Sequence, residues 1–281
     1  MGMDRVEIRR HNLVTTEAMP FDNPLGMTYD SGEYHAALDR AIDLADCDGF
    51  ETRRAESEAR GLKRGLGISS YIESSSGAPR ERAEIVVSGD ETVEVVIGTQ
   101  SSGQGHETSF CQVAAEWLGV PFETVTLRQG DTSFVSVGGG SHSGRSMRMA
   151  GTVIVMAGDL LIEKGKRLAA HVLEAAEADM EFANGVFTIK GTDRSIGIFE
   201  LAGEIDGRTD LPEDLQGGLE SEAENVMRTP AFPYGTHICE VEIDPETGEM
   251  CLDRYACVDD VGRVINPVIV DGQIHGGIVQ G

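Results

Sequence analysis

Glycine-rich loops between strand-like and helix-like segments constrain this chain more than any other feature. Residues 93–97 (VEVVI) are mostly β-branched, which predicts a buried strand, and the loop 98–108 (GTQSSGQGHET) follows directly. Apolar residues then recur at helical spacing, which predicts a helix from about Gly105 to Leu118. A second glycine-rich segment, 136–146 (SVGGGSHSGRS), opens a longer helical pattern. The order of strand, glycine loop and helix is therefore predicted twice.

The rest of the chain mixes short strands with helices. We predict strands at 66–73, 82–88, 92–98 and 123–129, a hairpin at 181–190, and two alternating strands within 234–262. Pro267 suits the first turn of a further glycine-rich helix. Residues 203–228 are acidic and lack periodicity, so we expect an exposed, poorly ordered loop there. This pattern predicts an α+β fold with a mixed β-sheet and packed helices.

The predicted domain organisation is an N-terminal linker with helices at 1–64 and one larger domain at 65–281. The apolar fraction of 40% is ample for a core of this size.

Charge and cysteine content exclude several classes of protein. The 48 acidic and 23 basic residues give a net charge of −25, which repels nucleic acid and anionic lipid. The five cysteines are scattered without a C-x-x-C pair, so we predict free thiols in a reducing compartment and no metal ligands. No apolar run reaches 18 residues, and the charged N-terminus does not resemble a signal peptide. We therefore expect a cytoplasmic protein without a membrane span.

Each glycine loop alone has an ordinary interpretation as a strand-to-helix connection. Gly103 and Gly105 begin like a dinucleotide-binding G-x-G-x-x-G, but Thr108 stands at the third glycine. The patterns of a P-loop, a zinc protease and a G-x-S-x-G hydrolase are also incomplete, and we interpret His106 as a hydrogen-bonded loop histidine. Three such loops together offer many neutral donors before helix N-termini. That set suits a large polar cofactor carrying phosphates.

Three segments, 98–108, 138–151 and 271–281, resemble in this order the second molybdopterin-binding domain of the xanthine dehydrogenase and aldehyde oxidase family. They are most similar to the large subunits of bacterial carbon-monoxide-dehydrogenase-type hydroxylases. The hairpin at 234–250 and the opening residues 8–38 resemble the same family, so the resemblance covers nearly the whole chain. It implies a fold of the molybdenum-cofactor-binding domain type.

The resemblance implies a molybdenum–molybdopterin cofactor in its cytosine dinucleotide form. Carried over by motif, the cofactor-binding residues are Gly103, Gln104 and Gly105 near the metal, Ser143, Gly144, Arg145 and Ser146 on the phosphate and pterin side, and Gln273 at the pterin. A helix N-terminus and a guanidinium are suited to holding a pyrophosphate.

Two residues depart from the family pattern and leave the substrate open. Ser102 stands where carbon monoxide dehydrogenases often have glutamine, and Gly144 stands where many relatives have serine. The family's catalytic glutamate, in a Gly-x-Gly-Glu motif, would lie beyond Gly281, and the domain with the copper-binding cysteine loop would lie before residue 1. We therefore predict a fragment without a catalytic residue of its own, inactive and without cofactor when isolated.

The resemblance implies the activity and partners of the whole enzyme. The activity would be oxidation of carbon monoxide, an aldehyde or an N-heterocycle, with water as the oxygen source. A medium subunit with FAD and a small subunit with 2Fe-2S clusters would accept the electrons, in a dimer of heterotrimers. The alternatives are a non-catalytic cofactor-binding or scaffolding module of the same fold, and a nicotinamide-dependent dehydrogenase, against which the missing third glycine argues.

Overall fold

The computed structural model describes residues 2–281, and their contacts divide the chain into two compact units. Unit 1 consists of the N-terminal residues through Ser75 together with Pro230–Arg263, and unit 2 consists of Ser76–Thr229 with Val264–Gly281. The predicted boundary after residue 64 differs from this division. Three strands that it assigns to the larger domain lie with the N-terminal helices, because they pair with one another.

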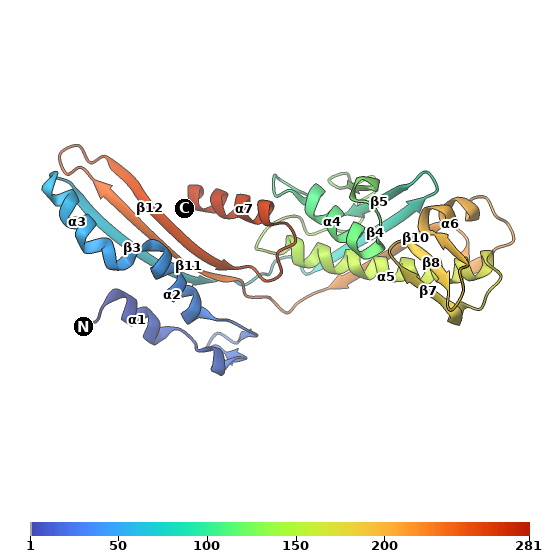
Figure 1. The fold of residues 1–281 in the computed structure, drawn as a ribbon, viewed down its shortest axis with the longest axis horizontal. Coiled ribbons are helices and arrows are strands. Elements are labelled where there is room, and N and C mark those ends of the chain that lie inside the picture. The colour runs from blue at the N-terminus through green and yellow to red at the C-terminus, as the bar shows by residue number, and fades with distance from the viewer. Residues whose placement is uncertain (1) are drawn as a thin grey trace. The chain divides into compact units, whose positions relative to one another are not determined.

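Unit 1 is built on a three-stranded antiparallel sheet in the order β12-β11-β3 (Figure 1). Its elements are α1 (Arg5–Asn12), β1 (Phe21–Asp22), β2 (Thr28–Tyr29), α2 (Tyr34–Ala45), α3 (Phe50–Ala59), β3 (Lys63–Ile72), β11 (Tyr234–Ile243) and β12 (Met250–Asp260), with 3-10 turns at Thr16–Ala18 and Cys47–Gly49. Helix α2 packs on β11 and β12, and α3 packs on β3.

Side chains alternate across the sheet of unit 1, so its two faces differ. Leu38 and Ala41 of α2 form a buried cluster with Ile68 of β3 and Ile238 of β11. On the same strand Glu240 is also buried, and it accepts hydrogen bonds from the guanidinium groups of Arg53 and Arg64. The residues between these buried positions, including His237 on β11, belong to the opposite face.

Unit 2 contains a four-stranded sheet in the order β10-β4-β5-β6 and a three-stranded sheet in the order β7-β8-β9 (Figure 1). Its elements are β4 (Arg80–Ser88), β5 (Thr92–Ile97), α4 (His106–Leu118), β6 (Val125–Arg128), α5 (Ser146–Val172), β7 (Met180–Ala183), β8 (Val186–Ile189), β9 (Ser195–Gly197), α6 (Ile198–Ile205), β10 (Leu219–Val226) and α7 (Pro267–Gln280), with 3-10 turns at Phe122–Thr124, Glu177–Asp179 and Glu213–Leu215. In the larger sheet only β5 and β6 are parallel. The predicted α+β class with a mixed sheet is confirmed.

The main core of unit 2 lies between the larger sheet and two helices. Helix α5 packs against β4, β10 and α4. Ile85 and Val95 of the sheet are fully buried with Phe110 of α4 and Val153 of α5. Gly165 permits a close approach, since a Cβ atom there would lie 2.3 Å from Cζ of Phe187 on β8. No helix within residues 2–281 has the combined length and apolar character needed to cross a bilayer.

The predictions from local patterns hold for most strands, and one expectation was wrong. The hairpin β7–β8 turns at Asn184 and Gly185, which both have positive φ, as a two-residue hairpin turn requires. By contrast, residues 203–228 include the end of α6 and the whole of β10, which pairs with β4 along its length. This segment is ordered because β10 forms a full backbone ladder with β4 and buries Leu219 and Ala223 in the core. Its acidic side chains also pair with arginines of β4, as Glu224 does with Arg80 at 2.7 Å.

Candidate functional site

The two glycine-rich loops of unit 2 cross each other in direct backbone contact. The first loop, residues 98–105, connects β5 to α4, and the second loop, residues 129–145, connects β6 to α5. A Cβ atom on Gly98 would lie 2.2 Å from Cα of Gly138, and a Cβ atom on Gly138 would lie 2.4 Å from Cα of Gly98. Side chains do not fit at either position, so glycine at both is what allows the loops to meet.

Hydrogen bonds hold the two loops and the start of α4 together. The hydroxyl of Ser141 donates to the carbonyl of Gln100 at 2.5 Å. The amide N–H of Ser101 donates to Oε1 of Gln129 at 3.0 Å, and Nε2 of the same side chain donates to Oε1 of Glu107 at 2.7 Å. The loops therefore form one connected framework.

A buried ion pair anchors this framework to the sheet. Arg145 and Glu81 both have fully buried side chains, and Nη2 of Arg145 lies 3.0 Å from Oε2 of Glu81. The guanidinium also donates to the hydroxyl of Thr99 at 3.1 Å, to the carbonyl of Gly140 at 2.5 Å and to the carbonyl of Ala78 at 3.0 Å. Arg145 thus joins the segment before β4 to both loops, and its position makes it a positioning residue for them.

Helices α4 and α5 both begin next to this framework without a side-chain cap. The N-cap of α4 is Gly105, with φ of 72°, and the N-cap of α5 is Arg145; neither side chain accepts a hydrogen bond from the helix. First-turn amides of both helices are therefore left without a capping side chain. The positive end of each helix dipole adds to these donors, and the combination favours an anionic ligand.

The backbone directly before α5 adopts an unusual conformation. Ser143 and Gly144 both lie in the left-handed region, with φ of 51° and 65°. This conformation is costly for serine, and such residues concentrate at binding sites. Both residues are exposed, as are Ser102 and Gly103 in the first loop. The two loops therefore present small polar residues to solvent from a buried framework.

The remaining predicted residue, Gln273, lies on α7. Asn266 caps this helix by accepting from the amide of Ile269 at 3.1 Å, and its own amide donates to Gln112 of α4 at 3.0 Å. The side chain of Ile269 occupies the space beside Gly105, where a Cβ atom would lie 2.9 Å from Cδ1. Gln273 follows Ile269 by one helical turn and is exposed on the same side of α7. The structure thus brings the start of α7 to the first loop.

His106 has the structural role that the sequence predicts. Its ring is buried, stacks on Phe110 with 4.3 Å between ring centroids, and has Nδ1 3.2 Å from the carbonyl of Thr99. Burial lowers the pKa of His106 below its ordinary value, so the ring is neutral near pH 7.

The topology of the larger sheet argues against a dinucleotide-binding fold. β5, α4 and β6 form one parallel crossover unit, but β4 and β10 are antiparallel to their neighbours. A Rossmann fold needs a mostly parallel sheet built from repeated units of this kind.

Glu81 and Thr99, the two side chains that hold Arg145, are not among the residues predicted from the sequence. Glu81 directly precedes the predicted strand at 82–88 and looks in the sequence like an ordinary solvent-facing residue. A detectable signal was its position in an alternating strand, on the side that carries Ala83 and Ile85.

Comparisons with known proteins identify the family to which this chain belongs. A family model described as a molybdopterin cofactor-binding domain matches residues 40–281. The whole chain is 33% identical to the carbon monoxide dehydrogenase large chain of Hydrogenophaga pseudoflava, of which it covers 37%. It is also 33% identical, over its whole length, to the 6-hydroxypseudooxynicotine dehydrogenase complex subunit gamma of Paenarthrobacter nicotinovorans, of which it covers 36%.

Among solved structures, quinoline 2-oxidoreductase from Pseudomonas putida 86 is similar over 99% of this chain, with a TM-score of 0.87 and 32% identity. The match covers 37% of that protein's chain. The present chain therefore spans a little over a third of the length of these relatives.

Proposed function

We propose that this chain, which belongs to the family of molybdopterin cofactor-binding domains, forms part of the cofactor cradle in the large subunit of a molybdenum hydroxylase. One observation carries the proposal: two glycine loops in backbone contact stand before two helix N-termini that have no side-chain cap. This arrangement supplies several N–H donors that need no reorganisation to meet a phosphate-bearing ligand.

The donor set fits the chemistry of a pterin dinucleotide. Although the chain carries a net charge of −25, residues 98–105 and 136–146 contain no carboxylate. Repulsion of a pyrophosphate is therefore reduced at these two segments. Neutral amide and hydroxyl groups can both donate and accept, which suits the edge of a pterin ring.

Individual roles are proposed from the family resemblance. Gly103, Gln104 and Gly105 would lie along the metal end of the cofactor, Ser143, Gly144 and Ser146 along the phosphates, and Gln273 at the pterin edge. Arg145 would act from inside by holding both loops in place, since its guanidinium donates to protein groups on every side. The cradle would thus combine an exposed contact layer with a buried support.

When bound, the molybdenum cofactor would supply the redox centre for hydroxylation of a substrate with oxygen from water. The chain's own loops would bind and orient the cofactor, and residues 98–105 and 136–146 contain no carboxylate that could remove a proton from the reacting water. We therefore expect the isolated 281-residue chain to show no turnover.

The partners proposed for the whole enzyme are a medium subunit with FAD and a small subunit with 2Fe-2S clusters, in a dimer of heterotrimers, with the cofactor in its cytosine dinucleotide form. All five cysteines are free, which supports a reducing compartment such as the cytoplasm. The relatives are named for carbon monoxide, 6-hydroxypseudooxynicotine and quinoline, at nearly equal identity to this chain. The proposal therefore extends to the reaction class and not to one substrate.

The test is molybdenum content in the protein purified together with its associated subunits. We expect about one molybdenum and one pterin per chain, and Gln104→Ala and Gln273→Ala should each lower this occupancy. Gln280→Ala is the matched control, because it is an exposed glutamine on the same helix as Gln273. Preparations without molybdenum would refute the proposal, and bound cofactor without oxidoreductase activity would favour the non-catalytic binding module.

A further inference from the structure

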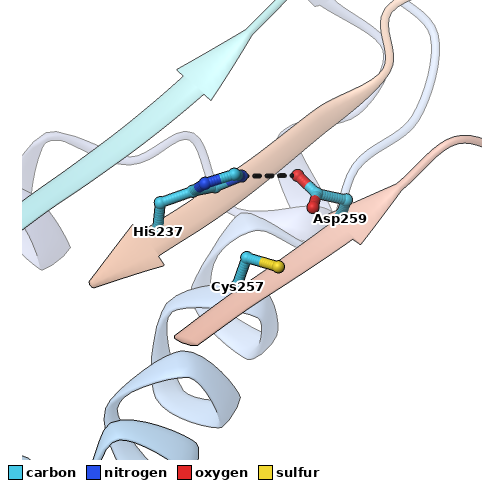
Figure 2. A group of neighbouring side chains, drawn as sticks. All are labelled: His237, Cys257 and Asp259. Carbon is cyan, nitrogen blue, oxygen red and sulfur yellow. Dashed lines mark hydrogen bonds and ion pairs between the residues drawn. The ribbon is translucent and has the colours of Figure 1, made fainter. Parts of the chain in front are cut away.

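Unit 1 holds a cluster of three potential metal ligands on the sheet face opposite α2. His237 lies on β11, and Cys257 and Asp259 lie on β12 (Figure 2). His237 is the direct cross-strand partner of Cys257, and Asp259 follows two residues later on the same face. One ligand atom from each side chain lies within 4.8 Å of those of the other two. The sheet register alone therefore brings a nitrogen, a sulfur and an oxygen ligand together.

One carboxylate oxygen in this cluster is buried without a hydrogen-bond partner. The side chain of Asp259 is only 4% exposed. Its Oδ1 accepts from the hydroxyl of Tyr71 at 2.7 Å and lies 3.0 Å from Nε2 of His237. Its Oδ2, by contrast, is buried and has no partner in normal hydrogen-bond geometry within residues 2–281. A buried acceptor in this state is uncommon, and a bound cation is one of the few ligands that would satisfy it.

Neighbouring tyrosines already orient two of the three ligands. The hydroxyl of Tyr255 lies 2.8 Å from Nδ1 of His237, which leaves Nε2 directed at the carboxylate, as Figure 2 shows. Tyr71 fixes Oδ1 of Asp259 and leaves Oδ2 free. Metal-binding histidines and carboxylates in proteins are held by outer hydrogen bonds of this kind.

Cys257 supplies the third potential ligand atom, because it lies directly opposite His237 and two residues before Asp259 on the same face of the sheet. A divalent cation at this position would stabilise a thiolate and the neighbouring carboxylate at once.

We propose that His237, Cys257 and Asp259 bind one divalent cation of the zinc type through Nε2, Sγ and Oδ2. Zinc takes nitrogen, sulfur and oxygen ligands at about 2.0–2.3 Å in a tetrahedral arrangement, and three protein ligands leave the fourth position for water. On binding, Cys257 loses its thiol proton. The proton on Nε2 of His237 is replaced by one on Nδ1, which then donates to the hydroxyl oxygen of Tyr255. This site is independent of the molybdenum proposal.

The test is a cobalt(II) titration of the 281-residue chain after treatment with a chelator, in the presence of a non-chelating reductant. We expect one cobalt per chain, a thiolate-to-cobalt charge-transfer absorption band, and loss of that band when zinc is added. Cys257→Ser should abolish the band, and His237→Gln should weaken binding by at least about tenfold. Cys251→Ser is the matched control, since this thiol is exposed near the start of β12 and should have no effect.

Two further variants keep the proposal falsifiable if Cys257→Ser fails to fold, which circular dichroism will show. Asp259→Asn keeps the thiol but weakens one ligand, and Tyr71→Phe keeps all three ligands but removes an outer hydrogen bond. Both should weaken cobalt binding by about tenfold or more. No stoichiometric binding, a band that persists in Cys257→Ser, or unchanged affinity in Asp259→Asn would overturn the proposal.

Discussion

Replacing Arg145 with methionine should strongly destabilise unit 2, because it leaves a buried carboxylate without its cation. Glu81 is fully buried and would keep the hydroxyl of Thr99, at 2.5 Å, and two longer contacts from the backbone amides of Arg82, at 3.3 Å, and Gly139, at 3.4 Å. Removing one partner of a buried pair costs about 3–5 kcal/mol. A domain of this size loses about 2–4 °C in melting temperature per kcal/mol. The expected decrease is therefore about 6–20 °C.

The assay is thermal unfolding followed by circular dichroism, with two matched variants. Arg80→Met removes an exposed arginine on β4 whose ion pair with Glu224 is exposed, and it should cost less than about 1 kcal/mol. The double variant Arg145→Met with Glu81→Met removes both charges. It should recover much of the loss, because a buried pair replaced by apolar residues of similar volume is often close to neutral.

The reasoning fails if Arg145→Met melts within about 3 °C of the parent chain, or if the double variant is no more stable than the single one. Either result would mean that the ion pair does not hold the loops.

Two other predictions concern the same loops. Gly138→Ala should destabilise unit 2 by about 1–3 kcal/mol and lower cofactor occupancy, since the new Cβ atom would lie 2.4 Å from Cα of Gly98. Urea unfolding measures the loss, and Gly197→Ala is the control because Gly197 has open space beside it and an ordinary φ. His106 has a folded-state pKa below 6.5, so as pH falls below about 6.5 the unfolded chain takes up a proton that the folded chain resists, and stability decreases. The urea midpoint should therefore decrease from pH 7.5 to pH 5.5, and this decrease should be smaller in His106→Gln than in the parent chain. Equal decreases in the two proteins would contradict this assignment.

Local patterns in the sequence predict those parts of the fold that local physics determines. The β-branched run of β5 and the turn at Asn184 and Gly185 are recognisable because neighbouring residues alone determine their conformation. Strand β10 was missed because only Leu219 and Ala223 of its inward face are fully buried apolar residues. In the sequence, its acidic outward-facing residues resemble those of a solvated loop. Only the folded chain shows that they pair with arginines of β4.

The candidate site was predictable in composition but not in its internal support. Glycine content indicates loops, but only the folded chain shows that Gly98 and Gly138 meet. Likewise, an arginine before a helix N-terminus suggests an anion ligand, and its burial depends on Glu81, which lies 64 positions earlier in the chain. The metal-ligand cluster was missed for the same reason, because the register of β11 and β12 joins residues without a recognisable spacing.

The path of the chain through unit 1 has a consequence for the order of folding. Ser75 and Ala231 form an antiparallel bridge that extends the pairing of β3 with β11, so the chain leaves unit 1 and returns to it at adjacent points. Residues 76–229 therefore behave as a long insertion at the tip of a hairpin. While this insertion is unfolded, closing the hairpin carries the entropy cost of a very long loop, and its prior folding draws the two ends closer. During synthesis, the N-terminal helices of unit 1 therefore cannot complete their packing until β11 is made, which happens only after residues 76–229.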